Sequence, residues 1–134
     1  MEIKRTANAG VLLKMDGKSV LIDGVCGSFP PYLETPQSIK EELYKNPPDA
    51  LLITHTHPDH FDLSFFESYK KAFRTHLGAE GSAFYENGRL RITAVKTRHI
   101  GKNNGEHFSF CIEGSKTIWF MGDASPSELV KLKD

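Results

Sequence analysis

The sequence predicts an α/β (α+β) fold that combines β-hairpins with helices. Two turn pairs, Asp16-Gly17 and Asn87-Gly88, each separate two apolar runs, and such pairs favour hairpins because both positions tolerate positive φ. Two segments, residues 36–45 and 63–73, carry apolar side chains at helical spacing. With 134 residues, 39% of them apolar and 25% charged, the chain has the size and composition of one globular domain.

The expected strands are short apolar runs bounded by turn residues. They cover residues 3–7, 11–15, 19–22, 49–54, 83–86, 89–95, 107–112 and 117–121. The apolar part of the segment 49–54 carries no charge, which is typical of a buried strand.

Capping residues predict where the helices begin. Thr35 is expected to be the N-cap of the first helix, with Pro36 as its first residue. Asp62 is expected to cap the second helix. Residues 125–128 have the spacing of a capping box, which predicts a third helix up to about Lys133.

The net charge and the absence of targeting signals limit the expected partners and location of the protein. Seventeen basic and seventeen acidic residues give no net charge, so a polyanion-binding surface and a nucleic-acid substrate are not expected. No apolar run has the length of a signal-peptide core or a membrane helix, so we expect a cytoplasmic protein without membrane association. Cys26 and Cys111 are then expected to be reduced thiols, although a disulfide between them stays open.

The segment 49–54 is followed by a dense cluster of ionisable groups, His55-Thr56-His57-Pro58-Asp59-His60. Imidazole and carboxylate are ligands that zinc accepts, and no thiol is nearby to make a closed structural site. His55 and His57 point the same way in an extended segment, so both can reach one ion. After the turn at Pro58, Asp59 and His60 can face a second position. The alternative is a polar loop whose histidines are only solvated.

This cluster resembles the His-x-His-x-Asp-His signature of the metallo-β-lactamase superfamily, a large group of mostly hydrolytic dinuclear metalloenzymes. The resemblance implies an αββα sandwich, in which two sheets pack face to face between helices and the metals lie at one edge. Residues 1–134 resemble the N-terminal half of that domain, with a mixed sheet and flanking helices. The family's second half, which brings one more histidine ligand, has no counterpart after Asp123.

The resemblance implies six ligands for two divalent metal ions, zinc in the first place, with manganese or iron as alternatives. The first ion would be held by His55, His57 and His99, the second by Asp59 and His60, and Asp123 would bridge the two. His107 competes with His99 for the first ion, but it opens a predicted strand, which suggests a structural role. His76 is expected to be structural or at the surface.

Three further residues are expected near the metals: Asp23, Phe29 and Tyr32. Asp23 closes a strand and is either a turn former or, as the resemblance implies, a support beneath the site that binds no metal. Phe29 and Tyr32 lie on the long connection at residues 24–36, which leaves that strand. They form one wall of a substrate pocket or pin the loop to the core.

The activity that the resemblance implies is that of a metal-dependent hydrolase. A divalent metal lowers the pKa of bound water to about 7, so a metal-activated hydroxide could attack a small ester, lactone, amide or phosphodiester. Asp59 would orient the water and act as the catalytic residue. Arg98 and Lys102 flank His99 and either hold a substrate anion or are solvated.

Two alternatives remain open. One is an iron-dependent oxidoreductase of the same fold, although relatives that pass electrons through a diiron pair usually carry a carboxylate where this chain has His57. The other is a non-catalytic half-domain. Without the second half, the strands with residues 51–53 and 118–120 are expected to leave one face uncovered, and a homodimer through that face would cover it.

Overall fold

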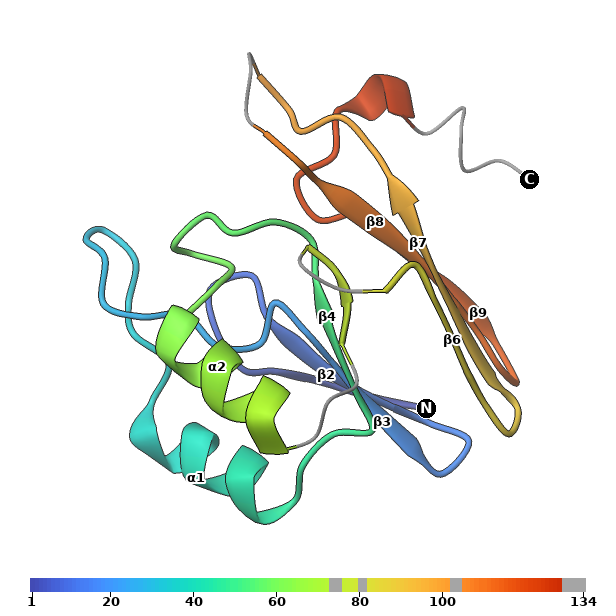
Figure 1. The fold of residues 1–134 in the computed structure, drawn as a ribbon, viewed down its shortest axis with the longest axis horizontal. Coiled ribbons are helices and arrows are strands. Elements are labelled where there is room, and N and C mark those ends of the chain that lie inside the picture. Colours follow the sequence, from blue (N-terminus) through green and yellow to red (C-terminus); the bar gives the residue numbers. More distant parts are fainter. Residues whose placement is uncertain (73–75, 80–81, 102–104, 129–134) are drawn as a thin grey trace.

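Two β-sheets pack face to face in the computed structural model, and two helices cover the outer face of the first sheet (Figure 1). The structure describes residues 1–72, 76–79, 82–101 and 105–128. Within these ranges it contains three layers, which are the helices, a mixed sheet and an antiparallel sheet. The predicted α/β class and the face-to-face sheets of the implied sandwich are therefore confirmed.

The first sheet is mixed. Its strands, in the order β1-β2-β3-β4-β5, are β1 (Glu2–Arg5), β2 (Val11–Met15), β3 (Lys18–Ile22), β4 (Ala50–Ile53) and β5 (His76–Gly78). The pairs β1–β2 and β2–β3 are antiparallel, and β3–β4 and β4–β5 are parallel. The predicted hairpin is confirmed, since Asp16 and Gly17 connect β2 to β3 with φ of 55° and 75°. The strand β5 was not predicted, because three residues are too short a pattern to recognise.

The second sheet is antiparallel. Its strands, in the order β6-β7-β8-β9, are β6 (Phe84–Asn87), β7 (Leu90–Lys96), β8 (Phe108–Glu113) and β9 (Thr117–Phe120). The hairpin between β6 and β7 is confirmed, but its turn lies one residue later than predicted. Asn87 pairs with Leu90, so the loop consists of Gly88 and Arg89, with Gly88 at φ 61°. Glycine at the first loop position fits a type II′ turn.

One apolar cluster fills the space between the two sheets. Its members are Leu13, Met15, Val20, Ile22, Ala50, Leu52 and Leu77 from the first sheet and Leu90, Ile92, Phe110 and Ile112 from the second. Period-two alternation explains this list, because every second side chain of a strand points to the same face. Ile118 and Phe120 of β9 also pack against the cluster. The expectation that residues 118–120 leave the inner face uncovered is therefore wrong.

The other face of β4 is covered by α1 (Gln37–Lys45) and α2 (Leu63–Ala72). Leu51 and Ile53 pack there against helix side chains that include Leu43 and Phe66. Both faces of β4 are thus buried, and the expectation of an open face at residues 51–53 is also wrong. The physical reason is that this chain contains both sheets of the sandwich, so that each covers the other.

The helix caps agree with the sequence in one case and differ in another. Asp62 Oδ1 accepts the Ser64 N–H at 3.1 Å, so the predicted cap of α2 is confirmed. Thr35 does not cap α1, whose N-cap position is Pro36. The Thr35 hydroxyl instead accepts the Cys26 N–H at 2.9 Å, which ties down the end of the loop. The predicted third helix begins as a single 3₁₀ turn at residues 126–128, and the rest of it lies outside the described residues.

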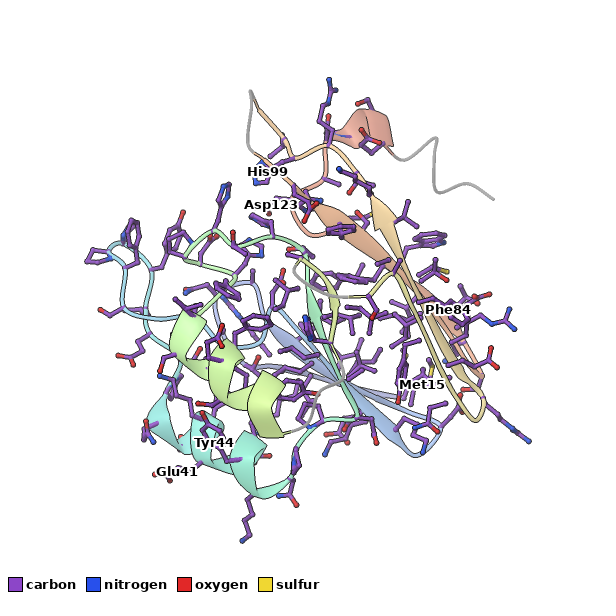
Figure 2. All side chains as sticks on the ribbon, in the orientation of Figure 1. Met15, Glu41, Tyr44, Phe84, His99 and Asp123 are labelled. Carbon is purple, nitrogen blue, oxygen red and sulfur yellow. The ribbon has the colours of Figure 1, made fainter. Side chains whose placement is uncertain are left out.

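The outer face of the second sheet carries the exposed aromatic side chains of this layer. Phe84, labelled in Figure 2, stands in one row across the sheet with Trp119. The two side chains are 53% and 37% exposed. A homodimer through an uncovered sheet face stays a prediction. Cys26 and Cys111 are both buried free thiols, as expected. The described part of the chain contains no helix long and apolar enough to cross a bilayer.

Two phenylalanines of the second sheet test this description of the core. Phe110 is fully buried between the sheets, so Phe110→Ala should lower the free energy of unfolding by about 3–5 kcal/mol. Phe84→Ala is the matched control and should cost less than about 1 kcal/mol, because that ring is half exposed. Urea denaturation of both variants measures the difference. Equal losses would contradict the assignment of inner and outer faces.

Candidate metal centre

The histidine cluster lies where the end of β4 meets the second sheet. The Thr54 carbonyl, directly after β4, accepts the Phe108 N–H of β8 at 2.8 Å, which joins the two sheets at this edge. His99 follows β7 and Asp123 follows β9, and Figure 2 shows these two residues together at the same end of the sandwich. The edge therefore collects side chains from three separate segments, as expected for a site built on loops that a rigid sandwich positions.

The carboxylate of Asp123 lies among three imidazoles. Its Oδ2 is 3.2 Å from Nε2 of His60, 3.4 Å from Nε2 of His99 and 3.6 Å from Nε2 of His55. The backbone of its segment is fixed at the same place, because the Asp123 carbonyl accepts the Ile100 N–H at 2.7 Å. An oxygen in this position can contact ions on either side of it.

Two sets of ligand atoms are close enough together to hold an ion each. His55, His57 and His99 form the first set and His55, His60 and Asp123 form the second, with atoms within 4.8 Å of one another. The first set is the one that the sequence analysis assigned to the first ion. In the second set His55 stands where Asp59 was expected. The structure thus brings the residues together, and their assignment as ligands stays a prediction.

Asp59 lies at the margin of the second set. Its Oδ2 is 3.3 Å from Nε2 of His60, and 21% of its side chain is exposed. It is therefore within reach of an ion bound to His60 and also of solvent.

A buried carboxylate supports the histidines from below. Asp23, which is 1% exposed, accepts the Thr54 N–H at 2.8 Å, the Thr54 hydroxyl at 2.6 Å and His60 Nδ1–H at 2.6 Å. Since it reaches the histidine cluster only through these neighbours, Asp23 is placed as a support beneath the candidate site. Whether it also lines a substrate pocket stays a prediction.

The same network sets the tautomers of two histidines. Because the Thr54 hydroxyl donates to Asp23, its oxygen accepts Nδ1–H of His55 at 2.8 Å. Nδ1–H of His60 donates directly to Asp23. In both rings Nε2 is therefore the nitrogen that faces the site, which is how a support orients a metal-binding histidine. Thr54 was not identified from the sequence, because only its contacts reveal this role.

Burial lowers the pKa of His55 to about 2, and the neighbouring histidines, His60 first, add to the effect. The ring is thus neutral at physiological pH and offers a lone pair. For His60, burial alone would lower the pKa, but the hydrogen bond and charge of Asp23 outweigh it and raise the pKa.

The Nε2 atoms of His55 and His99 fit a metal ion because they lack another partner. His99 donates Nδ1–H to the Ile100 carbonyl at 2.6 Å, which leaves Nε2 for the site. Among the described residues, neither of these buried Nε2 atoms has a hydrogen-bond partner. The His57 ring lies 4.5 Å from that of His55 and 4.9 Å from that of His99, between centroids. Buried polar atoms are normally paired, so this convergence points to an ion.

His107 is not available as a ligand. Its Nδ1 is hydrogen-bonded to Thr97 Oγ1 at 2.9 Å, and its Nε2 accepts the Asp123 N–H at 3.0 Å. With both nitrogens engaged, the ring cannot bind an ion without losing one of these bonds. The expected structural role of His107 is in agreement with these contacts.

The aromatic residues of the long loop do not pin it to the core. Phe29 and Tyr32 are 52% and 38% exposed, and they stack on each other with ring centroids 6.5 Å apart. The loop is held instead by the Thr35 N–H, which donates to the Cys26 carbonyl at 3.0 Å. Their role as a wall of a substrate pocket stays a prediction.

Arg98 is exposed beside His99, and its guanidinium donates to Ser127 Oγ at 2.9 Å and to Ser125 Oγ at 3.4 Å. These hydrogen bonds occupy part of its donor capacity and join the segment after Asp123 to the residues that follow β7. Lys102 lies outside the described residues.

The chain is similar to known proteins along almost its whole length. A family model described as β-lactamase superfamily domain matches residues 2–132. An isothiocyanate hydrolase from Delia radicum gut bacteria has 19% identity and a TM-score of 0.67, over 98% of this chain and 66% of that chain. A possible metal-dependent hydrolase from Veillonella parvula has 18% identity and a TM-score of 0.72, over 96% and 65% of the two chains. No curated protein sequence matches this chain.

A third similar structure has a different chemistry. CmlA from Streptomyces venezuelae, a diiron β-hydroxylase, has 16% identity and a TM-score of 0.62, over 97% of this chain and 31% of that chain. At such identities the similarity shows the fold alone. The chain spans about two thirds of the length of the two hydrolases.

Removal of one imidazole tests the first ligand set. His57→Ala should lower the zinc content of the purified protein by at least one ion per chain, because His57 completes a set of three ligands. Mass spectrometry of metals in the parent and in the variant measures it. His76→Ala in β5 is the matched control and should keep the parent's zinc. Equal zinc in the parent and in His57→Ala would contradict the assignment.

Protonation of buried histidines should make the metal-free protein sensitive to acid. Burial is the main cause of a lowered pKa in two histidines. It lowers the pKa of His55 to about 2 and that of His107 to about 4, from an ordinary value of 6.5. A lowered pKa adds stability above pH 6.5 that is lost as the pH falls below it. His60 and Asp23, whose pKa values are raised, act in the opposite direction, but His60 does so only above pH 6.5, so the two lowered histidines are expected to dominate between pH 5 and 6.5. Urea denaturation in a chelator should therefore show lower stability at pH 5 than at pH 7, and the reverse order would contradict these shifts.

Proposed function

Because this chain belongs to the metallo-β-lactamase superfamily, we propose that it is a metal-dependent hydrolase with two divalent ions at the centre described above. The observation that carries the proposal is the convergence of the buried, unpartnered Nε2 atoms of His55 and His99 with the carboxylate of Asp123. The support from Asp23 adds to it, because carboxylate–histidine pairs beneath a site orient ligands.

Zinc is the ion that we propose in the first place. The donor set consists of neutral imidazoles and carboxylates without thiols, which suits zinc and also leaves manganese and iron as alternatives. With fewer ligands than a closed structural site, each ion would keep a position open for a substrate or for water.

Three aspartates of the chain would have different roles in the reaction. When bound, the ions would lower the pKa of water to near 7, so that a hydroxide is available at neutral pH. Asp59, which is partly exposed and next to His60, is placed to accept a proton from that water and to orient it. Asp123 would balance the charge of both ions. Asp23 holds the ring of His60 in place.

The substrate that we propose is a small molecule with an electrophilic centre, namely an ester, lactone, amide or phosphodiester. The chain carries no net charge, which favours a small metabolite over a nucleic acid. We propose a cytoplasmic location, because Cys26 and Cys111 are free thiols, as is usual for proteins of a reducing compartment.

An iron-dependent oxidoreductase is the second candidate. The observation in its favour is the similarity of the fold to CmlA, a diiron β-hydroxylase. Metal analysis of protein purified without added metal separates the two candidates. Zinc or manganese would support the hydrolase, iron would support the oxidoreductase, and absence of metal would support a non-catalytic domain.

The role of Asp59 can be tested by a substitution that keeps its shape. Asp59→Asn should lower kcat on an activated ester or phosphodiester by about 100-fold or more, because the amide is neither a base nor a charged ligand. The circular dichroism spectrum should be unchanged, since Asp59 lies at the margin of the site. Asp16→Asn, in the turn between β2 and β3, is the matched control with parental activity. Near-parental turnover in Asp59→Asn would exclude a catalytic role.

A further inference from the structure

We propose that His107 is a positioning residue, which fixes the backbone of Asp123 and so holds its carboxylate between the two sets of histidines. The inference rests on the proposed metal centre, since it assigns a role toward the same ions. It concerns a residue that binds no ion itself and lies just before β8.

The donors and acceptors around His107 can be assigned from the Met121 carbonyl, which can only accept a hydrogen bond. Ser109 Oγ donates to the Met121 carbonyl at 3.1 Å, so its single proton is used there. The Thr97 hydroxyl, 2.9 Å from Ser109 Oγ, must then be the donor of that pair. Its oxygen accepts Nδ1–H of His107 at 2.9 Å.

This order leaves one tautomer for His107. With the proton on Nδ1, the neutral ring has a lone pair on Nε2, and that atom receives the Asp123 N–H at 3.0 Å. The chain of bonds begins and ends on the short segment that follows β9, since Met121 precedes Asp123 by two positions. His107 and its partners therefore hold both ends of the short segment that delivers the carboxylate.

The packing of Gly122 shows how closely this segment is held. Gly122 has φ 57°, and a Cβ added to it would lie 2.8 Å from Thr54 Cγ2 and 3.0 Å from His107 Nε2. The backbone at residue 122 thus passes directly between the end of β4 and the His107 ring. Since Thr54 is the residue before His55, the distance between the Asp123 carboxylate and the histidine ligands depends on this contact.

A backbone hydrogen bond of the next residue, Phe108, also holds the chain at His107 close to the end of β4. The Phe108 N–H donates to the Thr54 carbonyl at 2.8 Å, so the chain at residues 107 and 108 cannot move away from β4. The His107 side chain is fully buried, and its loss would leave the Asp123 N–H without its acceptor. The expected result is a carboxylate that is no longer held at its place, while the loop with His55 and His57 keeps its own support from Asp23 and Thr54.

The test is a zinc titration of the full chain by isothermal calorimetry, with three variants. His107→Phe keeps a ring but removes the acceptor, and it should weaken binding of the second ion by about 10-fold or more, as other supports of metal ligands do. Binding of the first ion, at His55, His57 and His99, should change by less than about 3-fold. His107→Gln, which restores an acceptor, should recover most of the loss. His76→Phe is the matched control and should behave like the parent.

A spectroscopic measurement tests the proposal independently of the ions. Nitrogen-15 NMR of the metal-free protein should show His107 with its proton on Nδ1, and a proton on Nε2 would overturn the inference. Unchanged zinc binding in His107→Phe would also overturn it, as would equal loss of both ions without recovery in His107→Gln. If His107→Phe does not fold, Thr97→Val decides instead, because it removes the acceptor of Nδ1–H and should weaken the second ion selectively. A parent chain that binds none of zinc, manganese and iron would refute the proposed function itself, while the NMR result would still report on His107.

Discussion

The buried carboxylate of Asp23 is the interaction on which the site depends. A carboxylate out of contact with water is costly unless its oxygens accept hydrogen bonds, and here a backbone N–H, a hydroxyl and an imidazole all donate to it. The donors come from residues directly after β4, while Asp23 itself follows β3. Parallel pairing of β3 with β4 brings these two strand ends to the same edge. The sheet thus places the support, and the support orients His55 and His60.

The second requirement is that the two sheets meet at this edge in a fixed position. The candidate ligands of the first sheet lie on the loop after β4, whereas His99 and Asp123 lie on segments that follow strands of the second sheet. An error in the packing of the sheets would separate the two groups. The bond from the Phe108 N–H to the Thr54 carbonyl and the close passage of Gly122 limit such an error at the site itself. The apolar cluster between the sheets supplies the stability, and these polar contacts supply the geometry.

The order of the layers determines which sheet faces are buried and which are exposed to solvent. Helices lie on the outer face of the first sheet, and the second sheet covers its inner face. The outer face of the second sheet presents Phe84 and Trp119. In a chain that spans about two thirds of the similar hydrolases, this is the face where a further layer or a second copy would find apolar surface.

The sequence by itself determined the local structure and most of the candidate site. Alternating apolar residues and turn pairs predicted the hairpins, and the charge-free run predicted β4. The spacing of His55 and His57 predicted a common position, with His60 facing a second one, because these are properties of neighbouring residues. Only the tertiary structure distinguished His99, which follows β7, from His107, which precedes β8, since their hydrogen bonds show which of the two rings has a free nitrogen. It also decided that Asp23 lies beneath the site and that both faces of β4 are covered. Such facts depend on residues far apart in the chain, and no local pattern contains them.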